Sequence, residues 1–353
     1  MDPPELLGCF YPCSTDPDYL AGHCDLPCPN SVRLFWKRSV LIGDLWKTPG
    51  VKFLPINLTC LPLYVPLIRP GVHRAKILGT YYVALSLYEA LRVFGVNGTY
   101  RPLDPKEFRR KKSHLCESSK VVLIGVAEDR LIEPFYKKYL AKHIPELLAG
   151  AGIAAVTAPN FSFFEDVPRS HSIYNRLRGL EVAEQFLRHE IPMIPHLNAL
   201  TNGDWQAWAK VLIANPQLSY VCKEFQTGNK DGVNREQAVE NLARLQDDIQ
   251  RSLHPIIVGG RSALPLLRKY FCSFTIADSI PSIRTNKRQL AVLEQNRLSW
   301  QPIKSASGAD LSTLLEHNLR IYRTAIAANL KNVEQSPALV EADQIAGAAV
   351  QTR

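Results

Sequence analysis

Four residues that can move protons stand at or just after short apolar runs of the chain: Glu165, Asp166, His196 and Glu224. Carboxylates serve as general bases or nucleophiles, and an imidazole exchanges protons near neutral pH. We therefore predict that these four residues are catalytic and that their chemistry is acid–base work.

A second set of residues near the same runs offers amide, guanidinium or carboxylate groups, or a bare glycine backbone. We predict ligand contacts for Asn160, Arg176, Asn198, Gly260, Arg261 and Asp278. The stretch Gly259-Gly260-Arg261-Ser262 ends an apolar run and opens a helical segment, so its amides and the helix dipole are suited to a phosphate group. For each residue the alternative is an ordinary solvated loop position.

The amino-terminal cysteines form a possible metal site. Cys9 and Cys13 make one pair, Cys24 and Cys28 make another, and each pair is separated by three residues. Paired thiolates on tight turns are typical of small tetrahedral zinc sites, although a spacing of two is more usual. We predict zinc here, with an iron–sulfur cluster or four ordinary thiols as the alternatives.

Basic residues are in excess and concentrate in one segment. Lys and Arg number 42 against 33 Asp and Glu, a formal net charge of +9. The densest part, residues 101–120, includes Arg109, Arg110, Lys111 and Lys112. Such a patch favours a polyanion, so we predict that these four contact nucleic acid; a solvated loop is the alternative.

The elements that must position these residues follow one repeated pattern from about residue 121 to 295. A short apolar run, a polar cluster and a longer segment with helical spacing recur six times, which is typical of βα units. The runs lack strict polar alternation, as parallel strands buried on both faces do. They are Val121–Val126, Ala154–Ala158, Pro192–His196, Ser219–Phe225, Pro255–Val258 and Ser273–Ala277.

The pattern extends toward the amino terminus. We predict a further strand over Leu61–Ile68, a helix over Ala75–Phe94 and one more strand over Val51–Leu58. The total approaches the eight units of a closed (β/α) TIM-like barrel. An open doubly wound sheet is the rival, but no glycine fingerprint for a nucleotide follows any run.

Three segments result from this division of the chain. Residues 1–48 form a Cys-rich extension, 49–300 the barrel, and 301–353 a carboxy-terminal helix with a tail. Within the last segment, leucines at near-helical spacing from Gly308 to about Val333 predict a packing helix, for which Asp310 is a suitable N-cap.

One stretch of the sequence resembles a known group of proteins. Residues Pro159–Pro168, the Tyr174-Asn175-Arg176 helix, Ile191–Pro195 and Glu224–Gly228 are similar to an uncharacterised family of bacterial and phage barrel-like proteins. The similarity covers roughly residues 120–230, and the chain has Asn160 where the family pattern has Asp. It implies a barrel and a setting on mobile elements or in phage defence, but no reaction.

Composition and motifs together predict a cytoplasmic barrel enzyme for a nucleotide or nucleic acid, working by base transfer or hydrolysis. A non-catalytic nucleic-acid-binding protein, using the cysteines and residues 101–120, is the alternative, and an interaction scaffold is a third. The partner is nucleic acid or a phosphorylated small molecule. A membrane partner is not expected, because the chain opens with Met1-Asp-Pro-Pro-Glu and no stretch nears about 18 apolar residues. The oligomeric state is left open.

Overall fold

The fold is described from a computed structural model of the chain. It describes residues 40–42, 50–58, 61–70, 73–92, 94–96, 99–140, 142–164, 169–226, 232–306 and 308–334. In this part of the chain, no helix combines the length and the apolar character that a membrane span requires.

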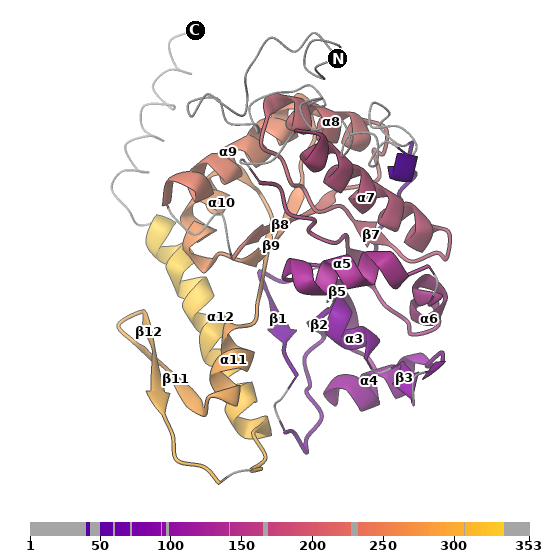
Figure 1. Cartoon of the computed structure of the whole chain (residues 1–353). Coiled ribbons are helices and arrows are strands. Elements are labelled where there is room, and N and C mark those ends of the chain that lie inside the picture. The colour runs from indigo at the N-terminus through magenta and orange to yellow at the C-terminus, as the bar shows by residue number, and fades with distance from the viewer. Residues whose placement is uncertain are drawn as a thin grey trace, which may run out of the picture.

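Eight parallel strands form a barrel, as the sequence predicts (Figure 1). They run in the order β7-β6-β5-β2-β1-β10-β9-β8, and a parallel bridge between His196, just after β7, and Cys222 of β8 joins the two edges. The strands are β1 (Tyr64–Ile68), β2 (Tyr82–Ser86), β5 (Lys120–Ile124), β6 (Ala155–Thr157), β7 (Met193–Ile194), β8 (Tyr220–Phe225), β9 (His254–Gly259) and β10 (Thr275–Asp278).

Helices surround the strands on the outside of the barrel (Figure 1). They are α3 (Leu87–Leu91), α5 (Asp129–Lys138), α6 (Ile144–Ala149), α7 (Arg169–Leu187), α8 (Asn202–Ile213), α9 (Gly232–Asp248), α10 (Leu264–Tyr270), α11 (Ile280–Asn286) and α12 (Ser312–Glu334). A short 3₁₀ helix, η3 (Arg261–Ala263), precedes α10.

Three smaller elements are added to this plan. Helix α4 (Pro105–Ser113) follows the short hairpin of β3 (Gly95–Val96) and β4 (Thr99–Tyr100), and the hairpin of β11 (Gln289–Glu294) and β12 (Arg297–Pro302) is inserted between α11 and α12. Figure 1 shows the β11–β12 hairpin at the outer side of the barrel, beside α11 and α12.

The strands are buried on both faces, so the core has two layers. Side chains such as Val65, Val122 and Cys222 fill the inside of the barrel, and a larger cluster lies between the strands and the helices. The absence of polar alternation in the apolar runs follows from this double burial. It is the reason why the sequence could place most of the strands.

Two predicted elements differ from the structure. The segment Ala75–Phe94, predicted as a helix, contains strand β2 followed by the short helix α3. All residues of β2 are buried, so its sequence has no polar alternation. A short apolar run of this kind can be told from part of a buried helix by its length alone. The segment Val51–Leu58 is no strand: Asn215 holds it in an irregular path by accepting from the Phe53 amide at 2.9 Å and donating to the Val51 carbonyl at 3.0 Å.

The carboxy-terminal helix is confirmed as α12, which packs against α10, α11 and β11. Asp310 stands just before it and accepts hydrogen bonds from the backbone amide and the hydroxyl of Ser312, at 3.0 and 2.6 Å. These bonds lower the pKa of the Asp310 carboxyl to about 2. Asp310 also accepts from the Ala75 amide at 3.0 Å, so it joins α12 to the connection between β1 and β2.

Candidate functional site at the mouth of the barrel

A pocket of about 520 Å³ opens where β1, β8, β9 and β10 end. In parallel barrels the ligand-binding groups stand at this carboxyl end of the strands. Its volume suits a small molecule. The walls include the side chains of Arg69, Gln226, Arg235, Arg261, Asp278 and Ile280.

Three arginines line this pocket, each from a different element. Arg69 follows β1, Arg235 lies on α9, and Arg261 follows β9, and all three are half-buried. Arg69 faces Glu89 at 3.5 Å, while Arg235 donates to the Ser262 hydroxyl and Arg261 lies 5.8 Å from the centre of the Tyr322 ring. Among the described residues, neither Arg235 nor Arg261 has a carboxylate within salt-bridge distance.

The glycine pair after β9 shapes the pocket wall. Gly259 and Gly260 have φ angles of +77° and +69°, which side-chain-bearing residues rarely adopt. A Cβ on Gly260 would lie 2.7 Å from the Cβ of Phe225, and one on Gly259 would lie 2.7 Å from the Cγ of Gln226. Glycine is therefore required at both positions for the backbone to turn into the pocket beside Arg261.

Asp278 is a buried carboxylate in the same wall, at the end of β10. It is 3% exposed, and its oxygens accept from the Tyr322 hydroxyl at 2.6 Å and from the Ile280 amide at 2.8 Å. Burial raises the pKa of this carboxyl, although the bond from Tyr322 and the charge of Arg261 act in the opposite direction. The structure thus places Gly260, Arg261 and Asp278, three of the predicted ligand contacts, in one pocket.

Glu224 stands at the edge of this pocket. It lies two residues from Cys222 on β8, so both side chains point to the inside of the barrel. Its carboxylate accepts from the backbone amide of Gln226, a pocket residue, at 2.6 Å. Glu224 as a whole is half-buried.

His196 lies elsewhere. It is 5% exposed, neither ring nitrogen has a hydrogen-bond partner among the described residues, and it lines a separate cavity of about 10 Å³ together with Phe161 and Trp208. Burial, with a smaller effect of the Lys223 charge, lowers the pKa of His196 to about 3. The imidazole is therefore neutral at physiological pH, and the prediction that it exchanges protons near neutrality is wrong.

Three of the predicted ligand contacts have partners within the protein. Arg176 forms an ion pair with the fully buried carboxylate of Asp204, so its charge is already balanced. Asn160 accepts from the Ala127 amide at 2.9 Å. Asn198 donates to the Phe161 carbonyl at 2.8 Å, and its own carbonyl accepts from Trp208 at 2.9 Å. These bonds fasten the loops after β5, β6 and β7 to one another and to α8.

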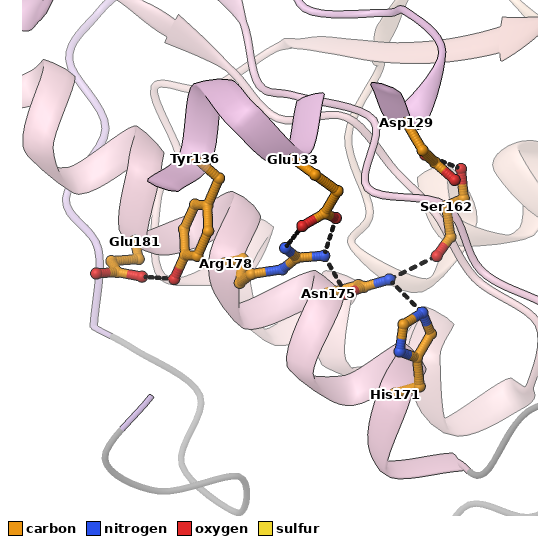
Figure 2. Close-up of polar contacts among 8 residues, drawn as sticks. All are labelled: Asp129, Glu133, Tyr136, Ser162, His171, Asn175, Arg178 and Glu181. Carbon is orange, nitrogen blue, oxygen red and sulfur yellow. Dashed lines mark hydrogen bonds and ion pairs between the residues drawn. The ribbon is translucent and has the colours of Figure 1, made fainter. Parts of the chain in front are cut away.

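The helix of the Tyr174-Asn175-Arg176 motif carries a second structural network (Figure 2). Arg178 is 4% exposed and donates two hydrogen bonds of 2.9 Å to Glu133 on α5 and one of 2.6 Å to Asn175. Its guanidinium lies over three aromatic rings, at 4.0 Å from Phe161, 4.8 Å from Tyr174 and 4.9 Å from Tyr136.

Asn175 extends this network to the loop after β6. It donates to the Ser162 carbonyl at 2.6 Å and contacts His171 at 3.0 Å, while the Ser162 hydroxyl donates to Asp129 at 2.8 Å. Figure 2 shows these contacts joining α5, the loop and α7. The most distinctive stretch of the sequence therefore anchors a loop against two helices, as far as its described residues show.

The basic segment is partly internal. Arg109 is 6% exposed, and its guanidinium donates to four backbone carbonyls at 2.9–3.4 Å. These carbonyls belong to Pro105, Ser119, Ala151 and Gly152. Arg109 therefore cannot contact nucleic acid as predicted. Arg110 is exposed, and Lys111 and Lys112 follow it on α4.

Other predicted residues lie outside the described part of the chain. These are the catalytic candidates Glu165 and Asp166 and the zinc candidates Cys9, Cys13, Cys24 and Cys28. Within the described residues, no group of three or more His, Cys, Asp or Glu side chains is arranged to hold a metal ion.

The sequence analysis missed two of the pocket arginines. Arg69 directly follows the predicted strand Leu61–Ile68, so the strand-end rule applied to residues 121–295 would have found it. Arg235 gives no such signal, because it lies inside a helix among other charged residues. Its place in the pocket depends on how α9 packs against η3 and α10.

Comparison with solved structures matches the chain to an HpcH/HpaI aldolase from Desulfitobacterium hafniense DCB-2. The identity is 9% and the TM-score 0.34, over 66% of this chain and 93% of that chain. The likeness is distant, and the barrel assignment rests on the strand order of this chain. No family model and no curated protein matches the sequence, so the resemblance to the bacterial and phage family stays a prediction.

The predicted function, an enzyme or binding protein for nucleotides or nucleic acid, needs correction. One of the four basic residues assigned to nucleic acid, Arg109, is buried and bound to backbone carbonyls. The pocket at the barrel mouth favours a smaller ligand.

Proposed function

We propose that the protein is a (β/α)-barrel enzyme whose substrate is a small anionic molecule bound at the barrel mouth. The observation that carries the proposal is the pocket after β8, β9 and β10, which three half-buried arginines line. A pocket of about 520 Å³ admits a small molecule rather than a folded macromolecule.

The charges of the pocket support an anion. Arg69 has Glu89 as a partner, but Arg235 and Arg261 face a hydroxyl and an aromatic ring. Asp278 is the one acid in the described pocket wall. Its pKa is raised and its carboxyl oxygens already accept hydrogen bonds from Tyr322 and Ile280, so it competes less strongly with a ligand for the arginines. The described wall thus holds three arginines against Asp278 and the Arg69 partner Glu89, and this excess of positive charge, where solvent is partly excluded, attracts an anion.

Glu224 supports an enzyme rather than a simple binding protein. A carboxylate held at the edge of the pocket by the Gln226 amide can take a proton from a bound molecule or return one. The arginines come from the end of β1, from α9 and from the end of β9, and Glu224 approaches from the inside of β8. We therefore assign anion binding to the arginines and proton transfer to Glu224.

The test is thermal stabilisation of the purified full-length protein by a panel of small carboxylates, sulfate and phosphates. The proposal predicts stabilisation by some of these anions, and its loss in Arg235→Gln and Arg261→Gln. Arg244→Gln is the matched control, because Arg244 lies on the same helix as Arg235 but is 62% exposed outside the pocket. Stabilisation by no anion, or equal stabilisation of all variants, would refute the proposal.

The role of Glu224 is tested with an anion that the panel identifies. Glu224→Gln keeps the shape of the side chain and removes the base. The variant should still bind the anion, while turnover of compounds that contain this anionic group should be lost. Turnover equal to that of the unmodified protein would remove Glu224 from the mechanism.

A further inference from the structure

The pocket has two ends, and their charges differ. Arg235 and Arg261 stand at the end formed by α9 and the β9 turn, where Arg235 is bonded to Ser262. Arg69 stands at the β1 end, two strands away in the order β1-β10-β9, next to Ile280 and Ile283 and paired with Glu89. Among the described residues, the pocket arginines without an ion pair are therefore the two at the α9 and β9 end, Arg235 and Arg261, and Asp278 is the acid of the same wall that Arg261 influences.

We propose that this end is a subsite for a phosphoryl group, so that the substrate is a phosphorylated small molecule. The inference rests on the proposed function and names its ligand class. A carboxylate carries one negative charge and two oxygens that a single guanidinium fork satisfies, so the second fork would have no ligand oxygen to bind. A phosphoryl group carries about 1.5 to 2 negative charges and three acceptor oxygens, which matches two forks.

The surrounding groups fit the same ligand. The Ser262 hydroxyl lies beside Arg235 and can donate to a third oxygen. The left-handed turn at Gly259 and Gly260 adds no side chains of its own to the pocket wall, where Phe225 and Gln226 pack against it. β9 and β10 are the seventh and eighth strands of the barrel counted from β1, and phosphate groups frequently bind after these strands in parallel barrels.

The other residues of the pocket wall determine which groups the rest of the substrate can carry. Ile280, which is 37% exposed, and Ile283 form an apolar part of the wall between Arg69 and the phosphoryl end. A short carbon chain or ring would lie against them. Glu224 then faces the part of the molecule nearest β8.

The inference is tested by calorimetric titration of the full-length protein with methyl phosphate, dimethyl phosphate, acetate and malonate. Methyl phosphate and dimethyl phosphate share a tetrahedral centre and differ in charge. We expect methyl phosphate to bind about tenfold or more tightly than the other three, because only it presents a compact dianion to two forks. Arg235→Gln and Arg261→Gln should each weaken methyl phosphate by about tenfold or more, and Arg244→Gln should not.

Arg235→Lys and Arg261→Lys provide a second pair of variants, which keep the charge and remove the fork. They should bind methyl phosphate more weakly than the unmodified protein while retaining its circular dichroism spectrum. Tighter binding of acetate, malonate or dimethyl phosphate through the same arginines would overturn the phosphoryl assignment and leave the proposed function standing. Binding of none of the four would overturn both.

Discussion

The network around Arg178 allows a quantitative prediction, because this guanidinium is nearly inaccessible to water. Replacing it in Arg178→Met removes two hydrogen bonds to Glu133, one to Asn175 and the contacts with three aromatic rings. The methionine fills much of the same volume, so cavity formation adds little. The decrease in the free energy of unfolding should therefore measure the lost polar and cation–π interactions.

The size of the effect follows from burial. Glu133 is 43% exposed, so solvent screens the ion pair, and we count it as about 1 kcal/mol. The ring contacts of a desolvated cation are worth roughly 1–2 kcal/mol. The side-chain amide oxygen of Asn175 loses its hydrogen-bond donor, which adds about 1 kcal/mol to the loss of stability. We expect Arg178→Met to lower the free energy of unfolding by about 3–4 kcal/mol in total.

Urea denaturation followed by fluorescence and circular dichroism measures this change. Arg188→Met is the matched control at the end of the same helix, since Arg188 is 61% exposed and its ion-pair partner among the described residues is Glu184, 45% exposed, at 3.1 Å. It should change the free energy of unfolding by less than about 0.5 kcal/mol. If Arg178→Met cost no more than Arg188→Met, the structural role of the network would be refuted.

Three further substitutions test other parts of the structure by the same denaturation assay. Arg109→Met should destabilise the protein by roughly 3 kcal/mol, because it orphans buried carbonyls, while Arg110→Met should have little effect; equal effects would contradict the burial of Arg109. The pKa of His196 is about 3 in the folded protein and roughly 6.5 in the unfolded chain, so acid favours unfolding by about 1.4 kcal/mol per pH unit between these values. The stability advantage of the unmodified protein over His196→Gln should therefore shrink as the pH falls from 6.5 to 4, and parallel curves would refute this. Gly125→Ala should cost roughly 2 kcal/mol or more, since a Cβ there would lie 2.5 Å from a backbone oxygen of β6, whereas Gly79→Ala, with no atom within 4 Å, should be tolerated.

The barrel was predictable because its strands leave a strong signal. Parallel strands buried on both faces appear as short apolar runs, and the polar residues after them mark the strand ends, which brought Gly260, Arg261 and Asp278 into the predicted set. Strand β2 was lost because its apolar residues continue at helical spacing into α3. Over so short a stretch, a buried strand and a buried helix can have the same pattern of apolar residues although their periods differ.

The site was only partly predictable, since sequence position does not reveal what a polar side chain contacts. Arg176 and Arg261 are alike in the sequence, but the first forms an ion pair with a buried carboxylate 28 residues away, and the second forms no ion pair with any described residue. Arg109 belongs to a run of basic residues, and only the fold shows that it turns inward. The partners in each case come from elements distant along the chain.

The measurement that tests the central claim most directly is the location of a bound dianion. Crystals grown with tungstate, a tetrahedral dianion that scatters anomalously, would reveal where such an ion binds on the protein. We predict an anomalous peak between the guanidinium groups of Arg235 and Arg261, within hydrogen-bonding distance of both. No peak there, or a peak only elsewhere on the molecule, would contradict the assignment of the barrel mouth as the anion site.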